Sequence, residues 1–212
     1  MELGKIQQGL EEFPFSFSPD LSKALQDYLR LLERWNKTYN LTGIRDTERM
    51  VTHHLLDSLS IVPLIEGTHI ADVGSGAGLP GIPLALHFPD KQFTLIDSNG
   101  KKTRFLTQAK IALGLNNVTV VQERMELVSE KFDQVICRAL APLVELAKSC
   151  AHLMASNGTL LAMKRADHEA LSEATPLEVK CRTQLRVPMV KEDRVVITLA
   201  RKASSKTISK SL

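Results

Sequence analysis

The sequence has few cysteines, few aromatic residues and no long apolar run, and each shortage excludes a class of protein. Its three cysteines, Cys137, Cys150 and Cys181, are far apart and odd in number, so neither a disulfide framework nor a Cys-x-x-Cys metal site is expected. Aromatic residues make up 5% of the chain, too few for a nucleic-acid surface dominated by base stacking. No apolar run reaches the length of a membrane span, and residues 1–8 lack the apolar core of a secretory signal. We therefore expect a cytoplasmic protein without a metal and without membrane association.

The length of the chain and its fractions of hydrophobic and charged residues are typical of a folded domain. The chain has 212 residues, of which 43% are hydrophobic and 24% charged, and this is enough for one large domain or a domain with an appendage. The net charge of +3 permits an anionic partner but does not require one. We expect a monomer.

Helical periodicity is present between about residue 20 and residue 62, so the first sixty residues are expected to be mainly helical. From Thr68 onwards short apolar strands alternate with helices. Helices are predicted over about 20–38 and from 46 or 47 to about 62, with a Pro/Phe/Ser connector at 14–19. Strands are predicted at 69–73, 93–96, 118–121, 132–137 and 159–163, and helices at 79–87, 101–113, 142–154 and about 167–174. Residues 157–158, Asn-Gly, are expected to form the turn that ends the helix at 142–154.

This alternation predicts an α/β fold with a mostly parallel, Rossmann-like sheet. Two further β-type segments, 178–187 and 194–199, have no helix between them and should form an antiparallel hairpin at the sheet edge. The expected organisation is a helical cap over residues 1–64, a ligand-binding domain over 65–200 and a tail over 201–212. The tail is basic and lacks apolar periodicity, so we expect it to be disordered.

A glycine-rich turn follows the first predicted strand. Residues 70–81 read Ile-Ala-Asp-Val-Gly-Ser-Gly-Ala-Gly-Leu-Pro-Gly, which is a strand, a turn almost without side chains, and the start of a helix. Bare backbone N–H groups and the helix N-terminus make such a turn a place where a ligand lies directly on the main chain. The turn formally matches the dinucleotide fingerprint, but a lone match of this kind is weak.

The position of Asp72, two residues before Gly74, favours a cationic ligand over a pyrophosphate. Together with the glycines it resembles the pattern of class I S-adenosylmethionine (SAM) methyltransferases, and a carboxylate there suits the cationic methionine part of SAM. Asp97 ends the second strand about twenty residues further on, where either cofactor needs a carboxylate for its ribose, although it could instead cap the next helix. Met125 and Glu126 stand where an adenine would lie, although they could also form an ordinary exposed turn.

The loop after the fourth strand points to the type of methyl acceptor. Residues 137–142 read Cys-Arg-Ala-Leu-Ala-Pro and contain neither Asp-Pro-Pro-Tyr nor Asn-Pro-Pro-Tyr, the runs of amino-directed methyltransferases. No general base is therefore expected, and Arg138 is the candidate for positioning the reactants. A ring nitrogen with a free lone pair, such as guanine N7, needs no base to be methylated.

Several runs outside the glycine turn resemble the RsmG family, also called glucose-inhibited division protein B. The resemblance covers nearly the whole chain apart from the extreme tail and rests on residues 35–42, 54–59, 72–85, 97 with 101–106, 124–126, 138–139 and 158–164. The family uses SAM to methylate N7 of one guanine in the decoding-region loop of bacterial 16S ribosomal RNA. The chain departs from the family pattern at Arg165, where many members have glycine, and at Ala77, where proline is frequent.

The turn chemistry and the resemblance together give a set of expected site residues. The residues expected to bind SAM are Asp72, Gly74, Ser75, Gly76, Gly78, Leu79, Asp97, Ser98, Asn99, Met125, Glu126 and Arg138. Of these, Gly74, Leu79, Met125, Glu126 and Arg138 match cofactor positions of the family. The residues expected to contact the substrate are Asn40, His54, Asp57, Lys101, Arg104, Lys164 and Arg165. The first three could instead be structural, with His54 and Asp57 pairing on one helix face.

The resemblance implies a partner, 16S rRNA or the small ribosomal subunit, and other functions stay open beside it. Lys102 and the tail cations Arg201, Lys202, Lys206 and Lys210 are further candidates for RNA contact, so binding should depend on salt. One alternative is a SAM-dependent methyltransferase acting on a small molecule or a protein, for which the helical cap argues weakly. The other is a non-catalytic nucleotide-binding or RNA-binding module with the same fold.

Overall fold

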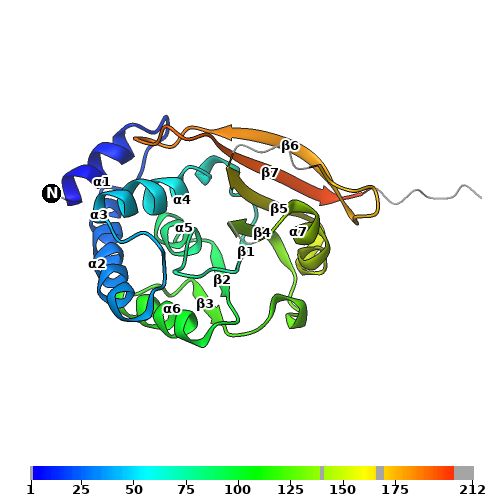
Figure 1. Ribbon diagram of the computed structural model, residues 1–212, viewed down its shortest axis with the longest axis horizontal. Helices are drawn as coiled ribbons and strands as arrows, with labels where there is room; N and C mark the ends of the chain where they lie inside the picture. Colours follow the sequence, from blue (N-terminus) through cyan, green and yellow to red (C-terminus); the bar gives the residue numbers. More distant parts are fainter. Residues whose placement is uncertain (1, 139–140, 166–169, 203–212) are drawn as a thin grey trace, which may run out of the picture.

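A seven-stranded sheet forms the centre of the molecule (Figure 1). The computed structural model describes residues 2–138, 141–165 and 170–202. The strands are β1 (His69–Val73), β2 (Gln92–Ile96), β3 (Val118–Val121), β4 (Phe132–Arg138), β5 (Met154–Arg165), β6 (Leu177–Leu185) and β7 (Arg194–Arg201). They lie in the order β3-β2-β1-β4-β5-β7-β6, with β1 to β5 parallel and β7 antiparallel to both β5 and β6. The predicted α/β class and the antiparallel edge hairpin are confirmed.

Helices precede the sheet and alternate with its strands. The α-helices are α1 (Glu2–Glu11), α2 (Leu21–Tyr39), α3 (Thr47–Met50), α4 (Asp57–Leu59), α5 (Gly81–His87), α6 (Gly100–Ala112) and α7 (Leu143–Cys150). A π-helical segment, η1 (Val51–Leu56), joins α3 to α4, and 3-10 turns lie at η2 (Val62–Leu64), η3 (Met125–Leu127) and η4 (Ala151–Leu153). The sequence analysis gave no bounds for a helix within residues 2–11, because the apolar pattern there is short. In the structure Ile6, Gly9 and Leu10 of α1 are buried.

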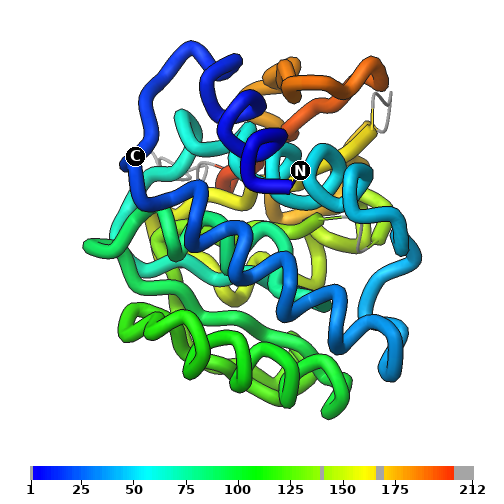
Figure 2. The backbone as a smooth tube through the Cα atoms, turned by 90° about the vertical axis from the view of Figure 1, so that its left-hand side faces the viewer, coloured from blue at the N-terminus to red at the C-terminus, as the bar shows by residue number. Residues whose placement is uncertain are grey.

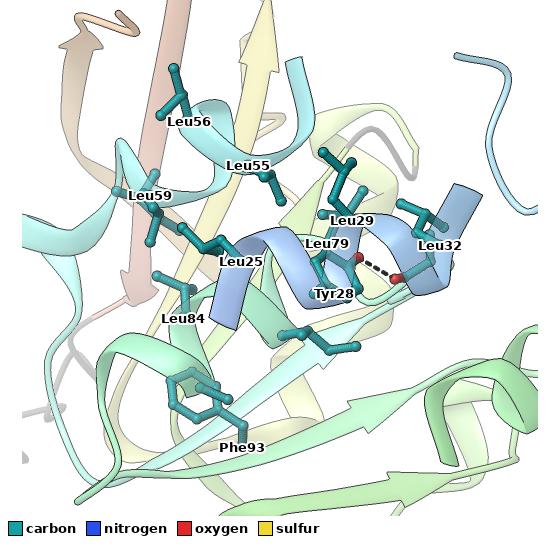
Figure 3. Packing of buried hydrophobic residues seen from close by; sticks show 14 of the residues in the cluster. Leu25, Tyr28, Leu29, Leu32, Leu55, Leu56, Leu59, Leu79, Leu84 and Phe93 are labelled. Carbon is teal, nitrogen blue, oxygen red and sulfur yellow. Dashed lines mark hydrogen bonds between the residues drawn. The ribbon is translucent and has the colours of Figure 1, made fainter. Parts of the chain in front are cut away.

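The two faces of the sheet pack against different helices. On one face, Ile70, Phe93 and Ile136 join an apolar cluster with residues of α1, α2, α5 and α6. On the other, alternate strand residues such as Ala71 and Val135 pack with α7, as the period of two along each strand requires. Figure 2 shows the long helix α2 crossing the molecule, and Figure 3 shows its leucines beside those of η1, α4 and α5. The N-terminal helices therefore share a core with the sheet.

Two details of the predicted secondary structure are wrong. Residues 170–174, the described part of the helix expected at 167–174, form loop and turn, and residues 167–169 lie outside the described chain. Asn157 and Gly158 do not end a helix, because α7 stops at Cys150 and β5 already begins at Met154. The register shifts between Phe132 and Gln134 of β4, so an irregular stretch of β5 accommodates the Asn-Gly pair. Most of the expected tail, residues 203–212, is also outside the described chain.

The connector between α1 and α2 packs against the rest of the protein through its aromatic residues. Phe13, Phe15 and Phe17 stack with ring centroids 5.1 to 5.4 Å apart, and Phe17 reaches His87 of α5 at 5.0 Å. Within the described chain, no helix combines the length and apolarity needed to cross a membrane.

Candidate active site

The glycine-rich turn leaves the carboxyl end of β1 in a left-handed conformation. Gly74, Gly76 and Gly78 have φ angles of 70°, 60° and 84°, a region that residues with a Cβ rarely adopt. A Cβ on Gly78 would overlap Ile82, and one on Gly81 would lie 2.7 Å from Asp72 Oδ2. A Cβ on Gly76 would instead meet no atom nearer than 3.8 Å. Gly78 and Gly81 are thus required by packing, whereas Gly76 keeps an open space in front of the backbone free of side chain.

Asp72 lies beneath the turn and holds its shape. Its Oδ2 accepts hydrogen bonds from Ser75 Oγ at 2.7 Å and from Gly81 N at 2.9 Å. The side chain is 1% exposed, and burial raises the pKa of Asp72 to about 6, against the lowering effect of the two hydrogen bonds and of Arg138. Its buried Oδ1 has no hydrogen-bond partner within the described chain. The carboxylate therefore supports the shape of the turn.

Asp97, at the end of β2, connects the turn to the next strand. Its Oδ2 accepts from Gly76 N and its Oδ1 from Asn99 N, both at 2.9 Å, and Lys102 Nζ lies 3.5 Å from Oδ2. Asn99, and not Asp97, caps α6, because its side chain accepts from Lys101 N at 2.9 Å. The carboxylate of Asp97 is thus free of the capping role that the sequence left open.

A pocket of about 460 Å³ lies at the ends of these strands. Its walls include seven residues that bear on the prediction: Gly74, Asp97, Ser98, Asn99, Lys102, Met125 and Glu126. Six of them were predicted from the sequence to bind SAM, and Lys102 was expected to contact RNA. Ser75 and Leu79, also predicted to bind SAM, are 2% and 8% exposed and lie within the turn and the core. Two carboxylates that accept hydrogen bonds, a thioether and the open space in front of Gly76 suit the ribose, the adenine and the amine of SAM.

A second, smaller pocket of about 140 Å³ lies on the other side of β1 along the same edge of the sheet. Apolar residues form part of its wall, and its titratable residues are His53, Asp57, Arg138, Lys164, Arg165 and Arg194. They come from the N-terminal helices, the ends of β4 and β5 and the start of β7. Four of the predicted site residues, Asp57, Arg138, Lys164 and Arg165, therefore meet here.

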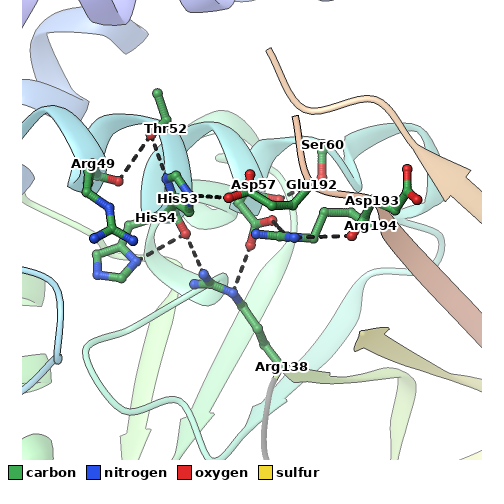
Figure 4. Close-up of polar contacts among 10 residues, drawn as sticks. All are labelled: Arg49, Thr52, His53, His54, Asp57, Ser60, Arg138, Glu192, Asp193 and Arg194. Carbon is green, nitrogen blue, oxygen red and sulfur yellow. Dashed lines mark hydrogen bonds and ion pairs between the residues drawn. The ribbon is translucent and has the colours of Figure 1, made fainter. Parts of the chain in front are cut away.

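Asp57 is held between two arginines at the centre of this second pocket (Figure 4). Arg138 Nε lies 2.9 Å from Asp57 Oδ2, and Arg194 Nε lies 3.0 Å from Oδ1. Arg138 Nη2 also donates to the backbone oxygen of His53 at 2.5 Å. The side chain of Asp57 is only 4% exposed, so the pair of arginines balances a buried charge. Sequence analysis missed Arg194, because only the register of β7 brings it within reach.

The other residues predicted to contact the substrate lie around this pocket or on the surface. His54 is 5% exposed, its Nε2 lies 2.8 Å from Thr42 Oγ1, and burial lowers its pKa to about 4. It makes no pair with Asp57 among the described contacts. Asn40 ends α2 with a φ of 49° and accepts from Arg45 Nη2 at 3.1 Å.

The predicted RNA-contacting cations have different surroundings. Lys101 and Arg104 are exposed on α6, and Arg165 is exposed at the end of β5. Lys164 Nζ donates to the backbone oxygen of Ala141 at 2.6 Å. The tail cations Lys206 and Lys210 lie outside the described residues.

Tyr28 of α2 supports the glycine turn and was not recognised from the sequence as more than a core residue. Its hydroxyl donates to the backbone oxygen of Ala77 at 2.6 Å, and its side chain is fully buried. Burial raises the pKa of the phenol above its ordinary value, so it stays a neutral donor. The helical segment thus fixes the turn from below.

The described side chains of His, Cys, Asp and Glu form no group of three or more that could hold a metal ion. Cys137 and Cys150 are buried with their sulfurs 3.7 Å apart, and the hydrogen bond with Cys150 together with burial raises the pKa of the Cys137 thiol.

Comparison with known families gives an extensive match. The sequence profile of GidB, rRNA small subunit methyltransferase G, matches residues 21–197. The chain is 46% identical over 201 residues to "Ribosomal RNA small subunit methyltransferase G" of Marinomonas sp., covering 93% of this chain and 97% of that protein. It is 52% identical over 161 residues to the protein of the same name in Legionella pneumophila, covering 75% and 76% of the two chains.

Solved structures show the same fold at low sequence identity. A mutant of MtNAS in complex with S-adenosylmethionine superposes with a TM-score of 0.59 at 13% identity, covering 95% of this chain and 90% of that one. Magnesium protoporphyrin IX methyltransferase of Synechocystis, with bound SAM, gives a TM-score of 0.53 at 14% identity, covering 83% and 98%. These neighbours share the fold of this chain.

Proposed function

The chain belongs to the rRNA small subunit methyltransferase G family, and from this premise we propose that it transfers the methyl group of SAM to N7 of a guanine in the decoding-region loop of bacterial 16S rRNA. The observation that carries the proposal is the pair of pockets at the carboxyl edge of the sheet. They lie on either side of the β1–β4 boundary, where the strand order reverses. Open α/β sheets bind their ligands at this position.

The residues around the larger pocket fit SAM. Asp97 takes the ribose hydroxyls, because a carboxylate with two oxygens can accept from both. Met125 packs on the adenine ring and Glu126 accepts from its exocyclic amine. Asp72, Gly74 and Gly76 form the backbone cradle for the methionine end. Bound there, SAM supplies a methyl group activated by its sulfonium.

The smaller pocket takes the guanine. Both oxygens of its carboxylate, Asp57, already accept from arginines, so this group is poorly placed to remove a proton. An acceptor that loses no proton, such as guanine N7, suits this arrangement, whereas an exocyclic amine does not. Arg138, at the boundary of the two pockets, positions the base for in-line transfer, and alignment of this kind supplies much of the rate.

Methylation of 16S rRNA in vitro tests the proposal. RNA from a strain without this protein is offered to the purified enzyme with SAM, as naked 16S RNA and as small-subunit particles in parallel. We expect N7-directed cleavage followed by primer extension to reveal one new methylated guanine in the decoding region. If that guanine is already methylated in the deletion strain, the proposed substrate is wrong.

Calorimetry with S-adenosylhomocysteine separates the enzyme from a non-catalytic nucleotide-binding module. We expect the protein to bind this product and not to bind NAD. Tight binding of NAD without binding of S-adenosylhomocysteine would overturn the assignment of the larger pocket. Binding of S-adenosylhomocysteine without methylation of either RNA substrate would point to a SAM-dependent methyltransferase with another acceptor.

A further inference from the structure

The charges that line the smaller pocket do not balance. Among the described residues, its walls carry three arginines, Arg138, Arg165 and Arg194, and one carboxylate, Asp57. Arg138 and Arg194 are 19% and 12% exposed, so water screens their charges only partly. The nearby carboxylate of Glu192 lies 3.8 Å from His53 Nε2 and is 61% exposed. The pocket therefore keeps a local excess of positive charge on a chain whose net charge is only +3.

The sheet register places two arginine side chains next to each other. Arg165 of β5 and Arg194 of β7 are direct partners in the antiparallel ladder. Side chains that face one another in such a pair lie on the same side of the sheet, and like charges placed there destabilise it. An anion bound between the two guanidinium groups would convert this repulsion into attraction.

The hydrogen bonds of the arginines leave donors for that anion. Asp57 accepts from Nε of both Arg138 and Arg194. Arg138 Nη2 donates to His53, and Arg194 Nη1 donates to the backbone oxygen of Asp193 at 3.1 Å. Among the described contacts, Arg138 Nη1 and Arg194 Nη2 donate to no acceptor. Two guanidinium groups held side by side by one carboxylate are a fixed set of donors for a tetrahedral oxyanion.

We propose that Arg138, Arg165 and Arg194 form a phosphate site, and that it binds a phosphodiester group of the RNA next to the target guanine. The site deepens the proposed function and rests on it for the identity of the phosphate. Asp57 is a positioning residue, because it orients the arginines and does not itself meet the anion.

The phosphate site also accounts for methylation beside so many cations. In the transfer the S–CH₃ bond breaks and the N7–CH₃ bond forms, so that one positive charge moves from the sulfur to the purine and no proton is transferred. Arginines without a bound anion would repel the cationic purine. A phosphate seated between them places a negative charge next to it, since the interaction of charges at such distances is strong in a partly dry pocket.

Salt dependence of RNA binding tests the site in a way that a structural role would not mimic. Arg194→Gln keeps a donor for Asp57 and removes the charge, and Arg165→Gln removes an exposed charge that no described contact needs for folding. Each lost phosphate contact should lower the slope of log K against log salt by about 0.7 to 0.9. Arg186→Gln, an exposed residue after β6 that does not line the pocket, is the matched control and should leave the slope unchanged.

Inorganic phosphate is a second probe that needs no RNA. At matched ionic strength, phosphate should raise the Tm of the wild-type protein relative to chloride, and this shift should disappear in Arg194→Gln and Arg165→Gln but not in Arg186→Gln. Calorimetry with S-adenosylhomocysteine should give the same affinity for all four proteins.

The outcomes separate this site from the proposed function. If the wild type methylates guanine N7 and both pocket variants behave like Arg186→Gln, the phosphate site is wrong and the function stands. If no rRNA is methylated but phosphate stabilisation requires Arg165 and Arg194, the anion site stands and the substrate is wrong. If the variants lose affinity for S-adenosylhomocysteine, the arginines bind the cofactor's carboxylate and the proposal is overturned. Should Arg194→Gln fail to fold, Arg165→Gln decides alone.

Discussion

The larger pocket is formed by three strand ends that follow one another in the chain, and much of its surface is backbone. The smaller pocket is formed by side chains from the N-terminal helices, β4, β5, β6 and β7. At the glycine turn beside the larger pocket, Asp72 accepts from the backbone N–H of Gly81, nine residues later, and Asp97 of the neighbouring strand accepts from that of Gly76. In the smaller one, the bond between Arg194 and Asp57 joins residues 137 positions apart.

This difference determines what each pocket tolerates. A pocket made of backbone is sensitive to the addition of a side chain, because the turn itself must change shape. A pocket made of long-range side-chain contacts is sensitive to the removal of charge, although the protein can still fold without that charge. Substitutions at the two pockets should therefore separate loss of folding from loss of function.

The largest expected effect is on the glycine turn. Gly78→Val places a branched side chain at a φ of 84° where a Cβ would overlap Ile82, and left-handed strain plus overpacking should cost about 3–5 kcal/mol of the free energy of unfolding. Gly76→Ala, at a φ of 60° in open space, is the matched control and should cost about 1–2 kcal/mol. Urea unfolding measures both.

Cofactor binding provides a second comparison between Gly78→Val and Gly76→Ala. The Gly76→Ala protein should fold but bind S-adenosylhomocysteine at least tenfold more weakly, because its methyl group occupies the space in front of the cradle. Equal stability of the two variants would show that Gly78 is not needed for packing. Wild-type affinity in Gly76→Ala would show that the cofactor does not approach this part of the turn.

The next effect concerns two buried groups whose pH dependences oppose each other. The pKa of Asp72 is raised from 3.8 to about 6, so its contribution to stability is present below pH 3.8 and is lost as the pH rises through about 6. The pKa of His54 is lowered from 6.5 to about 4, so its contribution is present above pH 6.5 and is lost as the pH falls through about 4. Each is worth about 3 kcal/mol across its window.

In the wild type these two pH dependences of the free energy of unfolding partly cancel, so each should become visible when the other group is replaced. Relative to the wild type, Asp72→Asn should gain about 3 kcal/mol of stability between pH 4 and pH 7, because the variant has no buried carboxylate to ionise. His54→Gln should show the reverse, with its relative stability rising by about 3 kcal/mol as the pH falls from 7 to 4. Denaturant titrations at several pH values give these differences. Parallel profiles for the wild type and both variants would mean that neither group titrates as its burial requires.

The contrast between the pockets also explains which parts of the fold and of the site could be predicted from the sequence. The strand, glycine turn and helix around Asp72 are local, so the apolar run and the glycines predict them. Met125 and Glu126 line the larger pocket together with Asp97, and the sequence predicts this proximity because the third strand end lies beside the second in a parallel sheet. Why Gly78 and Gly81 are glycines could not be read, since the reason is contact with Ile82 and Asp72 in three dimensions.

The features that could not be predicted from the sequence depend on strand register and on close approach between segments that are far apart in the chain. Arg194 carries no local signal, and only the pairing of β7 with β5 puts it opposite Arg165. Asn157 and Gly158 are typical of a turn, yet both lie within β5. A Cβ on Gly158 would come 2.9 Å from the backbone oxygen of Phe132, so close approach of the neighbouring strand requires glycine there. The helix at residues 2–11 has too few apolar positions to show its period, and packing on α2 stabilises it.

The smallest expected effect tests whether the shape of the larger pocket depends only on nearby residues of the chain or also on α2. Tyr28→Phe removes the hydroxyl that donates to Ala77 O and leaves that buried carbonyl without a partner, which should cost about 1–2 kcal/mol of stability. Because this bond ties α2 to the glycine turn, affinity for S-adenosylhomocysteine should also fall, by less than tenfold. Tyr39→Phe, at an exposed tyrosine on the same helix, is the control and should change neither quantity. If Tyr28→Phe loses stability but keeps wild-type affinity, the turn holds its shape without the helical segment, and the larger pocket depends only on the residues that follow β1 and β2.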